Sequence, residues 1–273
     1  MYVVTGATGN VGRVLVRTLA GAGLPVTAVA RKISGDEVPE GVRAVAADLA
    51  EPAGLGPAFE GAGALFLLVA GEDPQGVLDT ARTAGIRRVV LLSSQGVGTR
   101  PEAYGHPARF EKAVRESGLE WTVLRSGGMD TNAFAWAGSV RARREAAAPF
   151  GDIGLPFVDP DDVAAVAAAA LREDAHAGAV YTLTGPARTT PRERAAAIGA
   201  ALGEPVRFTE QTREEAHALM AGFMPLPVVE GTLAILGEPT EEERRAGPDV
   251  ERVLGRPAGT FAAWARRNAA AFR

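Results

Sequence analysis

Short apolar runs alternate with amphipathic stretches through the first two thirds of the chain. Each run is bounded by glycine or proline, which is typical of strands that helices cover on both faces of a parallel sheet. The pattern predicts seven strands, at residues 2–5, 25–30, 42–47, 64–70, 87–93, 121–124 and 179–183. Helices are predicted between them, notably at residues 11–22, 74–84 and 107–117. Strands and helices at this spacing form right-handed βαβ units, so we expect an α/β fold with a Rossmann-type, doubly wound parallel sheet.

The pattern becomes less regular after residue 125. A glycine-rich turn at residues 126–129 leads into an aromatic segment, and an acidic cap at residues 159–162 begins a helix that runs to residue 173. From residue 190 onward the pattern is mostly helical. We therefore expect a small, mostly helical substrate-covering region that is interleaved with the core. The expected division is a core of residues 1–125 and 154–184, a covering region of residues 126–153 and 185–256, and a C-terminal helix at residues 257–273.

A glycine loop follows the first predicted strand. Gly6, Gly9 and Gly12 recur at every third position, but 33 of the 273 residues are glycine, so the spacing alone is weak evidence. The context is stronger, because the loop joins the first strand to an amphipathic helix. Glycines there allow a pyrophosphate to approach the backbone at the helix N-terminus. The alternative interpretation of the loop is a glycine turn that binds no ligand. The expected cofactor contacts in the loop are Gly6, Thr8, Gly9, Asn10, Val11 and Gly12.

The end of the second strand indicates which dinucleotide binds. A carboxylate there would bind the ribose hydroxyls of NAD, but the strand ends in Arg31 and Lys32, and the next acidic residue is Asp36. Arg31 can pair with a 2′-phosphate in bidentate fashion, and Lys32 adds a second charge, which favours NADP(H). The alternative is that Arg31 and Lys32 are exposed basic residues at a strand end and bind no ligand. Asp48 and Leu49 end the third strand, where the carboxylate either accepts from the adenine amino group or caps a helix.

Composition narrows the range of functions. The net charge is −4, and the densest basic stretch, residues 141–144, is best interpreted as a solvated helix face, so we expect no nucleic-acid partner. The chain has no cysteine and only three widely separated histidines, so no metal site is expected. No apolar run reaches membrane-spanning length and no leader pattern is present, so we expect no membrane contact and a cytoplasmic location.

At this point the chain resembles the NmrA-like atypical short-chain dehydrogenases, a family that includes quinone reductase and triphenylmethane reductase types. The stretches that carry the resemblance are residues 3–12, 88–94, 117–125, 157–163, 181–186 and 260–266. The resemblance implies further cofactor contacts at the ends of the fourth and fifth strands, namely Val69, Ala70, Gly71, Ser93 and Ser94. It also implies that the turn after Arg125 lies beside the nicotinamide.

The catalytic residues are harder to assign. Ordinary short-chain dehydrogenases use a tyrosine with a lysine four residues later, but here Tyr104 is followed at that spacing by Ala108. Three candidates remain: Ser94 as a hydrogen-bond donor to a carbonyl, His106 as a proton donor, and Tyr104 as a displaced tyrosine. Each has a structural alternative, namely a capping serine, a backbone-bonded histidine and a loop tyrosine. Glu111 and Lys112 are predicted to be solvated helix surface.

Together these features predict an NADPH-dependent reductase that acts on a small molecule, an aromatic ketone or quinone-like compound. The residues expected to line its apolar pocket are Met129, Phe134 and Trp136, together with Phe223 and Met224. The missing lysine partner keeps open a non-catalytic NADP-sensing regulator that binds a protein partner. An isomerase or epimerase is a third reading, which the lack of the tyrosine base disfavours.

Overall fold

The computed structural model describes residues 1–273, and its largest feature is a seven-stranded parallel sheet. The strands lie in the order β3-β2-β1-β4-β5-β6-β8. Their bounds are β1 (Tyr2–Thr5), β2 (Val26–Ala30), β3 (Arg43–Ala46), β4 (Ala64–Leu68), β5 (Arg88–Ser94), β6 (Glu120–Ser126) and β8 (Ala179–Leu183). All seven predicted strands are present, with ends that shift by up to two residues. The predicted Rossmann-type fold is therefore confirmed.

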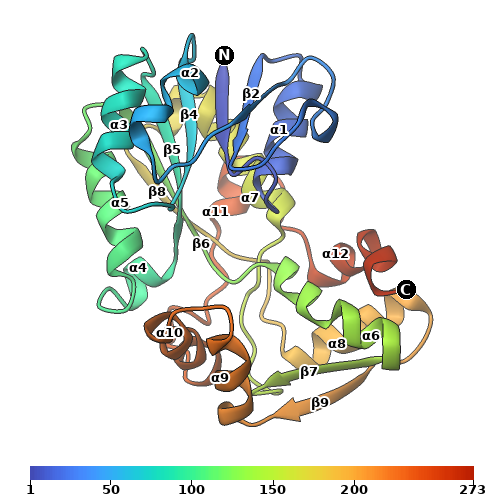
Figure 1. Ribbon diagram of the computed structural model, residues 1–273. Helices are drawn as coiled ribbons and strands as arrows, with labels where there is room; N and C mark the ends of the chain where they lie inside the picture. Colours follow the sequence, from blue (N-terminus) through green and yellow to red (C-terminus); the bar gives the residue numbers. More distant parts are fainter.

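Helices cover both faces of this sheet (Figure 1). Helices α1 (Gly12–Gly21) and α7 (Pro160–Arg172) pack on one face, and α3 (Pro74–Thr83) and α5 (Gly105–Glu116) pack on the other. Successive side chains of a strand point to opposite faces, so Val4 lies in the core beneath α1 and α7, while Val3 lies in the core beneath α3 and α5. Burial on both faces explains why the strands appear in the sequence as continuous apolar runs.

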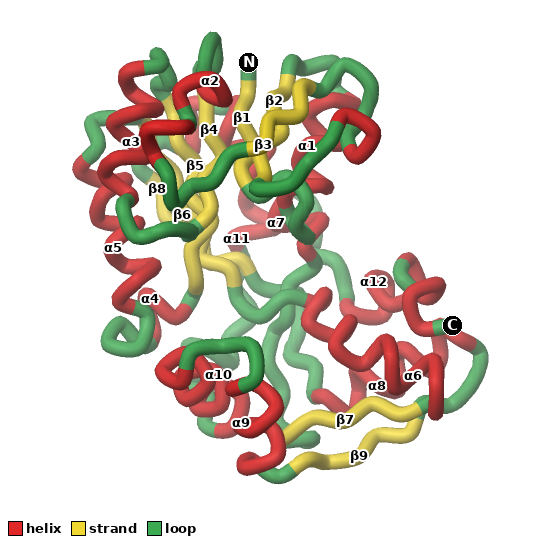
Figure 2. The backbone as a smooth tube through the Cα atoms, viewed as in Figure 1, coloured by secondary structure: helices red, strands yellow, loops and turns green.

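The strand order reverses between β1 and β4, which places a crevice at the carboxyl ends of these strands. The same edge of the sheet faces a second unit, drawn below the sheet in Figures 1 and 2. This unit contains a parallel pair of strands, β7 (Glu145–Pro149) and β9 (Arg207–Gln211). Its longer helices are α6 (Ala137–Arg143), α8 (Pro191–Leu202), α9 (Arg213–Ala221), α10 (Leu226–Gly237) and α12 (Phe261–Arg267).

The second unit has its own aromatic core. Trp264 contacts Phe134, Phe261 and Phe272 with ring centroids 5.0 to 6.2 Å apart. Trp136 and Ile198 are buried in the same cluster. This core lies among α6, α8, α12 and the strand pair, away from the seven-stranded sheet.

The structure differs from the predicted organisation in three places. Strands β7 and β9 lie in segments that were expected to be irregular or helical. Helix α11 (Asp249–Leu254) packs on α7 and β8, so it belongs to the core and not to the covering region. The predicted C-terminal helix is shorter, because α12 ends at Arg267 and a 3-10 turn at Ala269–Phe272 follows.

None of the helices has the length and apolarity needed to cross a membrane. Short helical segments complete the chain. The short α-helices are α2 (Gly56–Phe59) and α4 (Gly96–Thr99). The remaining 3-10 turns are Gly35–Glu37, Pro52–Gly54, Asp130–Trp136 and Asp174–His176.

Candidate active site

The glycine loop connects β1 to α1 in a tightly closed turn. Gly6 has a φ of 61°, in the left-handed region that favours glycine, and its carbonyl accepts the Gly9 amide at 2.9 Å. A Cβ on Gly12 would lie only 2.1 Å from the Gly6 oxygen, so no other residue fits there. The space around Gly9 is open apart from that same oxygen, which lies at 3.2 Å from an added Cβ. The loop therefore needs Gly6 and Gly12 for its own packing, while Gly9 leaves room for a ligand.

The N-terminus of α1 is suited to an anion. No side chain caps it, and its first turn contains no acidic residue. The first N–H groups of a helix have no partner within the helix, and they carry the positive end of its dipole. The residues present thus fit the pyrophosphate of a dinucleotide. Asn10 is exposed at this end, whereas Val11 and Gly12 are buried and contribute backbone only.

A cleft of about 850 Å³ extends from this loop along the carboxyl ends of β2, β1 and β4. Nine of the predicted cofactor residues line it: Gly6, Thr8, Gly9, Arg31, Lys32, Asp48, Leu49, Ala70 and Gly71. Arg31 and Lys32 are exposed at the end of β2, as binding of a 2′-phosphate requires. Asp48 is the one acidic residue in the lining, and its Oδ1 accepts the Ala50 amide at 3.0 Å, as in a turn. Val69 lies outside the cleft lining and packs against the core.

His106 contacts the wall of this cleft through Gly71. Its Nε2 donates to the Gly71 carbonyl, 2.8 Å away, because a carbonyl oxygen can only accept. Gly71 has a φ of 79°, and a Cβ there would lie 2.9 Å from the Leu49 carbonyl. The edge of the His106 ring also packs against Phe110, with centroids 5.3 Å apart. The structure therefore gives His106 a backbone-bonded position beside the cofactor cleft, and its role as a proton donor stays a prediction.

A second cavity, of about 210 Å³, lies beyond the carboxyl ends of β5 and β6. It brings together two of the predicted catalytic residues, Ser94 at the end of β5 and Tyr104 just before α5. The Tyr104 ring lies against Gly96, where a Cβ would be 2.4 Å from it. The Ser94 Oγ accepts the Gly96 amide at 3.2 Å, and its hydroxyl lies within hydrogen-bonding reach of Tyr104.

The surroundings of Tyr104 keep its hydroxyl protonated. Burial raises the pKa of Tyr104, and the carboxylate of Glu243 acts in the same direction. A hydrogen bond with Ser94 and the charge of Arg100 act to lower it, but the net shift is upward. No lysine lies beside the ring in the manner of ordinary short-chain dehydrogenases. Tyr104 is therefore suited to donate a hydrogen bond, but it does not release its proton readily.

Ser93 has a hydrogen-bond partner within the core, and a cofactor contact at this residue stays a prediction. Its hydroxyl donates to Glu111 Oε1 at 2.8 Å, on the side of β5 opposite to Ser94. Arg125 also donates to Glu111, through Nε at 2.9 Å and Nη2 at 2.8 Å. Burial acts to raise the pKa of Glu111, but the hydrogen bonds from Arg125 and Ser93 outweigh it and the pKa is lowered. The expectation that Glu111 is solvated helix surface was wrong, because Arg125 on β6 binds it within the core.

The aromatic residues expected in the substrate pocket lie elsewhere. Phe134 and Trp136 belong to the core of the second unit, where the Trp136 Nε1 donates to the Ala147 carbonyl at 2.8 Å. Met129 packs against the core beneath α1 and α7. Phe223 is 71% exposed, and Met224 packs beside α9 and α10.

Other residues form the wall of the 210 Å³ cavity. Its apolar side consists of Leu155, Phe157, Ile235 and Leu236, and its polar side includes Gln95, Thr99, Asn132, Thr232 and Glu243. The rule that ligands bind beyond strand ends could have indicated Gln95, which follows β5 directly. Nothing in the sequence indicated that α10 and the end of β5 line one cavity, so the contributions of α10 were missed.

Comparisons with known proteins show the family of the chain and the class of its cofactor. The family described as NAD(P)H-binding matches residues 6–174, which is more than half of the chain. A (4-alkanoyl-5-oxo-2,5-dihydrofuran-3-yl)methyl phosphate reductase from Streptomyces griseus is 37% identical over 100% of this chain and 99% of its own length. An NAD(P)H azoreductase from Xenophilus azovorans is 33% identical, with the same coverage.

The fold has solved counterparts as well. An NADPH-dependent quinone oxidoreductase from Escherichia coli, crystallised with NADPH, superposes with a TM-score of 0.79 at 23% identity. The match covers 98% of this chain and 99% of that one. The predicted family resemblance, the dinucleotide cofactor and the oxidoreductase class are confirmed by these relatives. The chain therefore belongs to the NAD(P)H-binding family of Rossmann-type oxidoreductases.

Proposed function

We propose that this protein is an NADPH-dependent reductase of a small quinone-like or aromatic carbonyl compound. The observation that supports this best is the placement of the 210 Å³ cavity. The cavity continues the row of strand ends along which the dinucleotide cleft lies, and Ser94 and Tyr104 both line it. The names of the relatives agree with this reaction class, since all three are reductases or quinone oxidoreductases.

Each part of the site has a separate task in this proposal. NADPH, when bound, supplies the hydride. The glycine loop and the N-terminus of α1 hold the pyrophosphate, and Arg31 holds the 2′-phosphate. Negative charge develops on the acceptor oxygen as it is reduced, and the Ser94 and Tyr104 hydroxyls donate hydrogen bonds to it. Because the pKa of Tyr104 is raised, we assign the final proton to water. Orientation and hydrogen bonding then carry the rate without a Tyr–Lys pair.

An assay of NADPH oxidation tests this proposal. The purified protein is incubated with NADPH and a panel of quinones and aromatic ketones, and the reduced product is identified by mass spectrometry. A Gly9→Val variant, designed to block the cleft, is the matched control and should show only the uncatalysed rate. Turnover of at least one quinone or ketone by the unmodified chain supports a reductase. Tight NADPH binding with no turnover across the panel contradicts it and favours the sensing regulator.

A further inference from the structure

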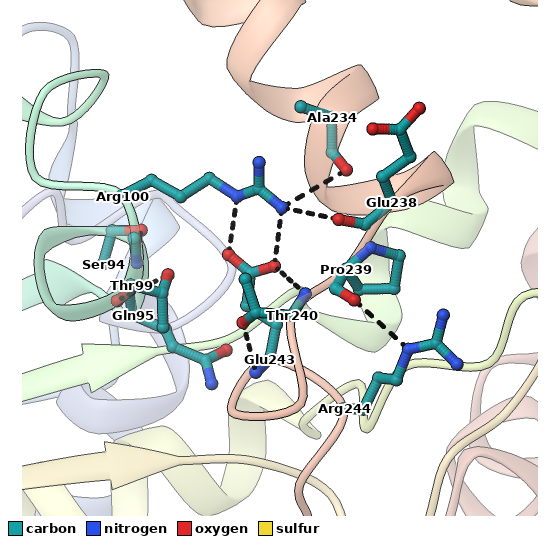
Figure 3. Close-up of polar contacts among 11 residues, drawn as sticks. Ser94, Gln95, Thr99, Arg100, Ala234, Glu238, Pro239, Thr240, Glu243 and Arg244 are labelled. Atoms are coloured by element: carbon teal, nitrogen blue, oxygen red, sulfur yellow. Dashed lines mark hydrogen bonds and ion pairs between the residues drawn. The ribbon is translucent and has the colours of Figure 1, made fainter.

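Glu243 is a buried carboxylate at the wall of the acceptor cavity. Its side chain is 2% exposed and lines the cavity together with Tyr104. Arg100 binds it in bidentate fashion, with Nε 2.8 Å from Oε1 and Nη2 2.9 Å from Oε2, as Figure 3 shows. The Thr240 amide donates to Oε2 as well, at 2.8 Å. Burial acts to raise the pKa of Glu243, but the hydrogen bond from Arg100 outweighs it, so the carboxylate stays ionised at neutral pH.

The positive charge of Arg100 is already engaged. The same guanidinium donates to the Glu238 carbonyl at 2.8 Å and to the Ala234 carbonyl at 3.4 Å, at the end of α10 (Figure 3). Arg100 itself is not among the residues that line the cavity. The guanidinium therefore joins the loop after α4 to the end of α10, and the side of this ion pair that contributes to the cavity wall is the carboxylate.

The rest of the cavity wall is uncharged. Its polar groups are hydroxyls and amides, and no lysine, arginine or histidine lines it. An anionic substituent would enter this space without a cationic partner and beside an ionised carboxylate. Both the lost hydration and the like-charge repulsion oppose that arrangement. The volume of 210 Å³ also lies below the ~300 Å³ at the small end of ligand pockets, which favours a small acceptor.

Resting on the proposed reductase function, we infer that the cavity selects an uncharged acceptor and that Glu243 is the residue that rejects anionic ones. Rejection of an unfavourable partner by a fixed like charge is a common route to specificity. The inference separates this chain from its Streptomyces griseus relative, whose named substrate carries a phosphate. The present cavity offers a phosphate, sulfonate or carboxylate no cation to bind.

A matched pair of acceptors tests the inference on the unmodified protein. One is a para-benzoquinone that carries a carboxamide, and the other is the same ring with a carboxylate, so the two differ in charge and hardly in size. Each kcat/KM is divided by the rate constant for direct reduction by a neutral dihydronicotinamide, which removes the difference in intrinsic reactivity. The corrected kcat/KM should favour the carboxamide by about tenfold or more. Equal corrected values would overturn the inference.

Two substitutions then locate the discrimination. Glu243→Gln removes the buried charge, and Glu242→Gln removes an exposed charge one residue away. The carboxamide-to-carboxylate ratio should fall about tenfold in Glu243→Gln and stay constant in Glu242→Gln. Because the ratio is taken within one preparation, a partly inactive variant does not distort it. An unchanged ratio in Glu243→Gln would mean that the charge of the bound cofactor, and not Glu243, repels the anion.

A binding measurement distinguishes failure of this inference from failure of the proposed function. Calorimetry on the NADP⁺-loaded protein compares benzamide with benzoate, and neither compound needs to react. Tighter binding of benzamide, lost in Glu243→Gln, supports the charge selection even if no quinone is reduced, in which case only the proposed reaction falls. Equal affinities in the unmodified protein would contradict the selection whether or not the protein turns over quinones.

Discussion

At the scale of single residues, the chemistry depends on two hydroxyls that share the acceptor cavity. Tyr104→Phe and Ser94→Ala each remove one hydrogen-bond donor to the developing oxyanion, and we expect kcat to fall by roughly 10²-fold with the Kd of NADPH unchanged. The raised pKa of Tyr104 further predicts that kcat does not fall between pH 6 and pH 9 through loss of its proton. Steady-state kinetics and calorimetry check both points.

His106→Ala is the control: it frees the Gly71 carbonyl and should weaken NADPH binding more than it lowers kcat.

The choice of dinucleotide also depends on a single residue. Arg31 is exposed at the end of β2 and lines the cleft, where the only carboxylate is that of Asp48. A charge-assisted hydrogen bond to the 2′-phosphate contributes about 1.5 to 3 kcal/mol, which is roughly ten- to a hundredfold in affinity. Arg31→Ala should therefore weaken NADPH by that factor and leave NADH unchanged in titration calorimetry. An equal loss for both cofactors would place the 2′-phosphate elsewhere.

At the scale of elements, the loop between β1 and α1 separates glycines needed for packing from those needed for binding. Gly12→Ala forces a Cβ to within 2.1 Å of the Gly6 oxygen, so we expect the melting temperature to fall by several degrees. Gly9→Val meets little protein and should keep the melting temperature, yet abolish NADPH binding, because the side chain projects into the cleft. Thermal unfolding and an NADPH titration measure the two effects. Tight binding by folded Gly9→Val would show that the pyrophosphate lies elsewhere.

The elements also show how far the sequence can be interpreted without a structure. The inner strands of the main sheet were predictable because both of their faces are buried, which leaves an apolar run for each. The edge strand β3 has no buried residue and was predicted from its short apolar run alone. Strand β7 has the sequence Glu-Ala-Ala-Ala-Pro and β9 is largely exposed and polar, so neither carries a strand pattern; pairing with each other decides their conformation. The cofactor cleft is built from local loops and was predicted, whereas the acceptor cavity needs residues of α10 beyond the end of β5. Glu243 and Arg100 are 143 residues apart, and no local pattern links them.

At the scale of the whole molecule, acidic residues at the start of α7 join the core to the C-terminal segment of the second unit. Arg256 binds the Asp162 carboxylate with its Nη1 2.7 Å from Oδ1, and Arg267 binds Asp159. Asp130 lies beside this junction with no exposed surface, and neither of its carboxylate oxygens has a hydrogen-bond partner. Burial raises the pKa of Asp130 to about 8, and the charge of Asp159 adds to the shift, against the attraction of Arg194 and Arg267.

This arrangement predicts a stability that falls as the pH rises. Between the ordinary carboxyl pKa of 3.8 and the native value of about 8, folded Asp130 holds a proton that the unfolded chain has released. The stabilisation from that proton is complete below pH 4 and is lost as the pH rises through 8, because the folded state binds the extra proton. Asp130→Asn should therefore melt above the unmodified protein by a margin that grows from pH 5 to pH 9, since ~1 kcal/mol shifts the melting temperature by roughly 2–4 °C at this size. Asp152→Asn, which removes an exposed carboxylate, should keep the unmodified pH dependence. A constant difference between Asp130→Asn and the unmodified protein from pH 5 to pH 9 would show that Asp130 titrates normally and that its burial in this junction is incomplete in solution.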